Sequence, residues 1–199
     1  VSVDALFTEA SMRDLRMIAG KVMMDRNAPE ELLDTAQSSY DQSKALIDIW
    51  HRKGRNLYAI TPRFAPTSSP EQLELAGALF KESEGVYVQS HVSENLDEIT
   101  WVRDLFPSAK SYLDVYSKMG LLGPRSLYGH GIHFSDKEIA MAAETGTGIV
   151  HCPTSNLFIG SGLFQYQKLR EAGVSLALGT DIGGGSSLSP FATMKAAYE

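Results

Sequence analysis

His91 and Glu94 are the two residues with the clearest potential for chemistry. His91 follows an apolar run at 86–90, and Glu94 stands three positions further on. A neutral imidazole can bind a metal ion, and a carboxylate beside it can move protons. A structural explanation stays open at this point, in which His91 bonds a loop carbonyl and Glu94 is a favourable charge at a helix N-terminus.

Asp181 and His130 also lie at or just after the ends of apolar runs. Asp181 follows an apolar run at 174–179 and precedes three glycines, 183–185, which match neither the P-loop nor the dinucleotide-binding pattern. Such glycines let the backbone come close to a site. His130 is flanked by glycines and could bind a metal or a metal-bound water. The alternatives are an aspartate that caps the next turn and a histidine of the core.

A second group of residues fits substrate binding. Arg63 and Phe64 follow a predicted strand and together offer a planar set of donors beside an aromatic face, which suits a flat heterocycle rich in acceptors. A surface arginine beside a buried phenylalanine is the alternative. His151 fits a site or a structural role equally well, and His133 fits a structural one. Cys152 has no base beside it in the sequence, which argues against a nucleophile.

Six apolar runs alternate with helical patterns, which predicts six βα units. Strands are predicted within 14–24 and at 57–61, 86–90, 126–130, 147–151 and 174–179. Helices are predicted at about 29–53, 69–84, 96–105, 111–119, 135–144 and 163–171, and from 189 onward. Capping-box patterns begin the helices at 69 and 135.

Two folds can hold this order of elements: a doubly wound open sheet and a (β/α)8 barrel. In a barrel every strand end faces one shared site, whereas an open sheet concentrates ligand groups at one switch point. Polar side chains able to do chemistry follow five of the six strands: Arg63, His91, His130, His151 and Asp181. We therefore predict a partial TIM-like (β/α)8 barrel of about six units, forming one domain over residues 1–199.

Bulk properties exclude several classes of protein. The chain has 199 residues, a hydrophobic fraction of 43% and a net charge of -6, which predicts an ordinary globular core. The only basic cluster, 51–55, is short, so nucleic-acid binding is not expected. The sequence has no apolar run of 18 residues, so no membrane span is expected. A single cysteine excludes an internal disulfide and fits a reducing, cytoplasmic setting.

Several motifs together resemble those of amidohydrolase-superfamily deaminases. They are Ser90-His91-Val92-Ser93-Glu94-Asn95, Gly129-His130-Gly131, His151-Cys152-Pro153-Thr154-Ser155-Asn156 and Gly179-Thr180-Asp181, in this order. Thr61-Pro62-Arg63-Phe64, Gln89-Ser90-His91 and the run 179–185 are most similar to the guanine deaminase branch. Each motif alone is weak, but the set covers nearly the whole chain.

The resemblance implies a zinc-dependent hydrolase that converts guanine to xanthine and ammonia, with iron as an alternative metal. It implies one zinc per subunit, bound by His91 and Asp181 together with two histidines of a His-x-His motif. It also implies Glu94 as proton shuttle and purine contact, His130 and Asp181 as catalytic groups, and Arg63 and Phe64 as purine-binding residues. A homodimer is the assembly that the resemblance suggests.

The sequence departs from that family pattern in two respects. No two histidines are spaced by one residue, and the family's small β-domain has no counterpart here. The chain therefore resembles a fragment that holds two of the four expected metal ligands, and we expect it to be inactive alone. The alternatives are a deaminase or chlorohydrolase for another heterocycle, an inactive remnant that serves as a binding module, and a non-enzymatic doubly wound domain.

Overall fold

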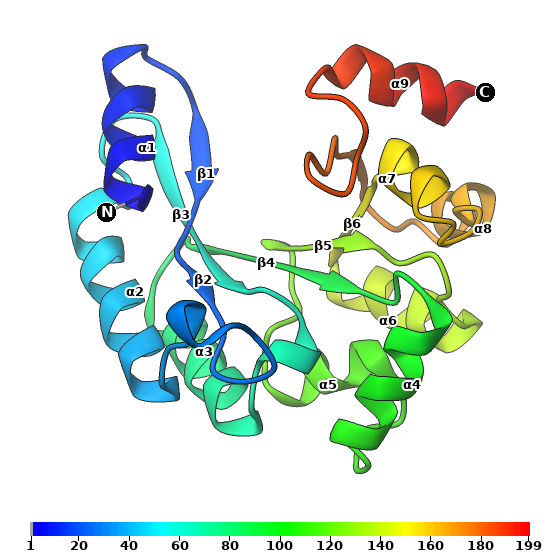
Figure 1. Cartoon of the computed structure of the whole chain (residues 1–199), viewed down its shortest axis with the longest axis horizontal. Helices are drawn as coiled ribbons and strands as arrows, with labels where there is room; N and C mark the ends of the chain where they lie inside the picture. The colour runs from blue at the N-terminus through cyan, green and yellow to red at the C-terminus, as the bar shows by residue number, and fades with distance from the viewer. Residues whose placement is uncertain (1) are drawn as a thin grey trace. The chain divides into compact units, whose positions relative to one another are not determined.

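The computed structural model describes residues 2–199 (Figure 1). They form two compact units. Of the described residues, unit 1 comprises 2–90 and Met119–Leu121, and unit 2 comprises His91–Lys118 and Leu122–Glu199. Within residues 2–199, no helix combines the length and the apolar character that a membrane crossing needs.

The strands of unit 1 are all parallel. Strand β1 (Met17–Ala19) and strand β2 (Val22–Met23) both pair with β3 (Asn56–Pro62), and β3 pairs with β4 (Tyr87–Val92). Six of the seven residues of β3 are buried, which is typical of a parallel strand that is covered on both faces. The last two residues of β4 belong to unit 2.

The helices of unit 1 correct two of the predictions. They are α1 (Ser2–Met12), η1 (Glu30–Leu32), α2 (Ala36–Trp50), η2 (Ala65–Thr67) and α3 (Pro70–Glu82). The helix predicted from Pro29 begins only after Thr35, whose side chain accepts a hydrogen bond from the backbone of Ser38 in a capping box. Helix α1 was not predicted, because it buries only Phe7 and Ala10 and so lacks a broad apolar stripe.

Unit 2 repeats the strand-then-helix order. Strands β5 (Ser126–His130), β6 (Gly148–His151) and β7 (Leu176–Leu178) are paired in parallel in that order. The helices are α4 (Leu96–Leu105), α5 (Tyr112–Lys118), α6 (Asp136–Thr145), α7 (Pro153–Phe158), α8 (Tyr166–Glu171) and α9 (Pro190–Tyr198). Helix α7 lies outside the helix ranges predicted from the sequence, and Pro153 occupies its first turn, where a proline costs no hydrogen bond.

An aromatic cluster in the core of unit 2 supports the strand that carries His91. The rings of Tyr116 and Tyr128 pack with their centroids 4.7 Å apart, and both side chains are fully buried. The hydroxyl of Tyr116 donates a hydrogen bond of 2.9 Å to the carbonyl of His91. Nearby, the hydroxyl of Tyr112 donates a bond of 2.7 Å to the buried carboxylate of Glu98. The backbone carbonyl of His91 is therefore held by a hydroxyl of a packed aromatic layer.

Candidate metal centre

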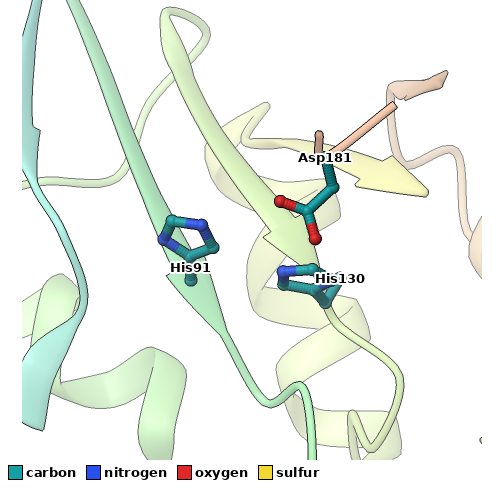
Figure 2. Close-up of side chains that lie close together, drawn as sticks. All are labelled: His91, His130 and Asp181. Atoms are coloured by element: carbon teal, nitrogen blue, oxygen red, sulfur yellow. The ribbon is translucent and has the colours of Figure 1, made fainter. Parts of the chain in front are cut away.

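Three side chains of unit 2 converge on one point: His91, His130 and Asp181 (Figure 2). One potential ligand atom from each lies within 4.8 Å of the others. His91 lies near the end of β4, His130 ends β5, and Asp181 follows β7. The two imidazole rings are stacked, with centroids 5.4 Å apart, and the carboxylate of Asp181 points toward them. The carboxyl ends of parallel strands thus bring together groups that are 90 positions apart in the sequence.

The backbone at this cluster is unusual. His130 has φ +75° and Asp181 has φ +46°, a left-handed conformation that costs a residue with a Cβ about 1–2 kcal/mol. The backbone also passes close to the Asp181 carboxylate at Gly184. A Cβ added at Gly184 would lie 2.9 Å from Oδ2 of Asp181, so a side chain there would collide with the carboxylate. Strain of this kind concentrates where a site requires a fixed geometry.

His130 is uncharged at neutral pH. Its side chain is 1% exposed, and burial lowers its pKa to about 4. The charge of His91 also lowers the pKa, while the charge of Asp181 and the hydrogen bond with Asn156 raise it. A neutral imidazole keeps a lone pair available for a metal ion or for a water molecule.

Two further side chains hold His130 in place. The side-chain amide of Asn156 forms a hydrogen bond with His130, with Nδ2 of Asn156 3.0 Å from Nδ1 of His130, and Oε1 of Glu94 lies 3.5 Å from the same nitrogen. Asn156 is buried, and its Oδ1 atom has no hydrogen-bond partner among the described residues. Asn156 ends the motif at 151–156, but no role was predicted for it. A helix predicted from Pro153 would have placed it about one turn after the end of a strand.

The donor set fits a transition-metal ion. Two imidazole nitrogens and one carboxylate are the ligands that Zn²⁺ and Fe²⁺ take in proteins, whereas Mg²⁺ and Ca²⁺ prefer oxygen alone. Burial keeps His130 in the neutral form that metal binding requires. Within residues 2–199, the cluster of three side chains that could hold such an ion includes His91 and Asp181, the two ligands that the resemblance implied.

Arg63 and Phe64 lie in unit 1, directly after β3. The guanidinium carbon of Arg63 lies 5.0 Å from the centroid of the Phe64 ring, a distance typical of a cation–π contact. Arg63 is exposed and Phe64 is partly buried. The pair therefore presents the donor fork and the aromatic face that its residue types suggested.

The remaining candidates lie outside the three-residue cluster. His151 stacks on Phe164 with centroids 4.2 Å apart, and both residues line a cavity of about 650 Å³. His133 contacts the carbonyl of Ser161 through Nε2 at 2.8 Å, as a structural histidine does. Burial, followed by the charge of Asp181, raises the pKa of Cys152 to about 12, so its thiol stays protonated and is a poor nucleophile.

A family model described as "Amidohydrolase family" matches residues 2–199. The chain belongs to the amidohydrolase family. This amidohydrolase chain is 54% identical to guanine deaminase of Escherichia coli (strain K12) over 198 residues, which cover 100% of the chain and 45% of that protein.

Two solved structures agree with this assignment. A structure of E. coli guanine deaminase matches with a TM-score of 0.98 at 54% identity, over 99% of this chain and 46% of that one. A guanine deaminase from C. acetobutylicum, with bound guanine in its active site, matches with a TM-score of 0.91 at 36% identity, over 97% of this chain and 46% of that one.

These matches confirm the predicted fold, a partial TIM-like barrel of parallel βα units, as well as the predicted resemblance to guanine deaminases. The amidohydrolase chain spans less than half the length of the relatives reported above.

Proposed function

We propose that this chain is part of an enzyme that hydrolyses guanine to xanthine and ammonia. The observation that supports the proposal most is the cluster of His91, His130 and Asp181 with Glu94 beside it, in a chain 54% identical to a guanine deaminase. The reaction replaces the amino group of a purine carbon by oxygen from water, so it needs an activated water and a group that moves protons.

His91 and Asp181 are proposed as metal ligands, and zinc, one ion per subunit, as the metal, with iron as the alternative. The two further histidines that the resemblance implies have no counterpart among these 199 residues. When bound, the ion supplies Lewis-acid activation of a water molecule near neutral pH. The other steps depend on side chains of this chain.

Glu94 is proposed to move the protons. Its carboxylate accepts a proton from the attacking water and passes it to the ring nitrogen next to the reacting carbon, and a second transfer lets the amino group leave as ammonia. Asp181 can accept the other proton of that water. His130, which is neutral and held by Asn156, orients the water and stabilises the negative charge that develops on the attacked purine.

Arg63 and Phe64 are proposed to bind the purine. The guanidinium of Arg63 donates hydrogen bonds to the acceptor atoms of the base, and the ring of Phe64 packs against its face. The contact between the two side chains supports this assignment, because it places the guanidinium beside the aromatic ring. A cytoplasmic location and a homodimer are part of the same proposal, and size-exclusion chromatography with light scattering tests the dimer.

The experiment is an assay of zinc content and guanine turnover on the longest natural chain that contains these 199 residues. We expect one zinc per chain and release of xanthine, and we expect Arg63→Lys to raise the KM for guanine because a lysine lacks the planar fork. Zinc without guanine turnover would favour a deaminase or chlorohydrolase for another heterocycle. Absence of both would favour an inactive remnant that serves as a binding module.

A further inference from the structure

Residues 63–69, which carry the proposed purine-binding pair, form an irregular segment between β3 and α3. Its only regular part is η2, a single turn of three residues. Two backbone bonds close that turn, from Thr67 to Phe64 and from Ser68 to Ala65. A turn this short does not fix the direction of the flanking side chains by itself, because 3₁₀ geometry is weakly bonded.

The segment at residues 23–27, which begins with the last residue of β2 and is called the 23–27 loop below, lies against the 63–69 segment and binds it at successive positions. The carbonyl of Met23 accepts a hydrogen bond from the backbone of Arg63 at 3.2 Å, and the backbone N–H of Asp25 donates to Thr67 at 3.0 Å. The side chain of Asn27 donates to the carbonyl of Pro66 at 2.7 Å, and that of Arg26 donates to the carbonyl of Ala65 at 3.2 Å. The 23–27 loop thus follows the 63–69 segment along its length.

The carboxylate of Asp25 makes the charged part of this contact. Its Oδ1 accepts from the backbone N–H of Ser69 at 2.7 Å, and its Oδ2 accepts from the hydroxyl of the same serine. The Ser69 hydroxyl also accepts from the backbone of Gln72 as the N-cap of α3. Through Ser69, the Asp25 carboxylate therefore joins the 23–27 loop to the 63–69 segment and to the first turn of α3, and hydrogen bonds to a carboxylate are stronger than those between neutral groups.

We propose that Asp25 is a positioning residue for substrate binding, which fixes the 63–69 segment and thereby the orientation of Arg63 and Phe64. The proposal rests on the proposed function, since it assigns purine binding to that pair. Asp25 would act through the segment, because an arginine that is already held in the binding orientation loses less conformational freedom when the substrate binds.

The test compares Asp25→Ala and Asp25→Asn with Asp34→Ala in the longest natural chain that contains this sequence. Asp34 is a matched control, because it is a partly buried carboxylate of unit 1 that pairs with Lys21 and not with the 63–69 segment. Asparagine keeps an acceptor for Ser69 and should restore part of the effect. We expect Asp25→Ala to raise the KM for guanine about tenfold with little change in kcat, Asp25→Asn to raise it less, and Asp34→Ala to leave it unchanged.

A second readout does not depend on activity. We expect amide hydrogen exchange within residues 64–69 to accelerate about tenfold in Asp25→Ala and to stay at the wild-type rate in Asp34→Ala. Unchanged exchange in Asp25→Ala would overturn the proposal, and so would an equal rise in KM in both alanine variants. If the wild-type protein fails to turn over guanine, the proposed function fails, and the exchange rates alone then decide whether Asp25 positions the segment.

Discussion

Oε1 of Glu94 lies 3.5 Å from Nδ1 of His130. The two residues come from the loop after β4 and from the end of β5, and the imidazole is almost fully buried. A carboxylate next to a neutral imidazole can give and take a proton without creating a second buried charge. The pair is therefore a suitable place for the proton transfers that a hydrolytic deamination requires.

Glu94→Gln tests that function directly. The amide keeps the size of the side chain but cannot accept a proton from water, so kcat should fall by a factor of about 10²–10⁴. Metal content should not change, because Glu94 lies outside the three-residue cluster. Steady-state kinetics and metal analysis of the same preparation check both expectations, and full turnover in this variant would remove Glu94 from the mechanism.

Asp181→Asn and His91→Asn should lower the amount of metal that the purified protein retains. Each change removes one donor from the cluster, and loss of a ligand weakens binding far more than a surface change does. His133→Asn is the control, because His133 bonds a loop carbonyl outside the cluster. Elemental analysis after dialysis should show metal in the control only. Equal retention in all three variants would contradict the ligand assignment.

His130 should make the stability of the metal-free protein depend on pH. Its pKa is about 4 in the folded chain, because burial disfavours the charged ring, and about 6.5 when exposed. Between these values the unfolded chain binds a proton that the folded chain does not. The free energy of unfolding should therefore decrease as the pH falls from about 6.5 to about 4, by at most about 3 kcal/mol.

The measurement is urea denaturation of the metal-free wild type and of His130→Gln across that pH range. The variant cannot take up the proton in either state, so its stability should decrease less steeply toward low pH. Parallel curves for the two proteins would mean that His130 has an ordinary pKa in the folded chain.

Gly77→Ala should destabilise the protein although alanine favours helices. A Cβ on Gly77 in α3 would lie 1.8 Å from the carbonyl oxygen of Met119, so the backbone must move. We expect the free energy of unfolding to fall by a net of about 1–3 kcal/mol, because the cost of moving the backbone outweighs the gain of about 1 kcal/mol in helix propensity. Gly123→Ala is the control, because nothing lies within 4 Å of its added Cβ. Thermal denaturation should separate the two variants, and equal midpoints would contradict the close contact.

The sequence predicted the order of elements well, because apolar runs and helix caps are local signals. The strand predicted at 126–130 agrees with β5, and the helix predicted at 96–105 agrees with α4. The prediction was wrong at the start of α2, where Leu32 and Leu33 continue the apolar spacing but are exposed, at 57% and 37%. Periodicity alone cannot show that a face has nothing to pack against.

The site could be predicted only in part. His91, His130 and Asp181 could each be picked out because they lie at predicted strand ends. That the three side chains come together follows only once the fold is known. The bond between Asn156 and His130 joins residues 26 positions apart and depends on how α7 meets the end of β5. No local pattern encodes such a contact, so it had to come from the structure.

The left-handed backbone at Asp181 has a consequence for directed evolution. A mutant library sorted for heat resistance alone should enrich glycine at position 181, because glycine adopts φ +46° without the steric cost of a Cβ. That replacement would delete the carboxylate that is proposed as a metal ligand. Heat-resistant variants should therefore be screened for retained metal at the same time, because at this position the two properties favour different residues.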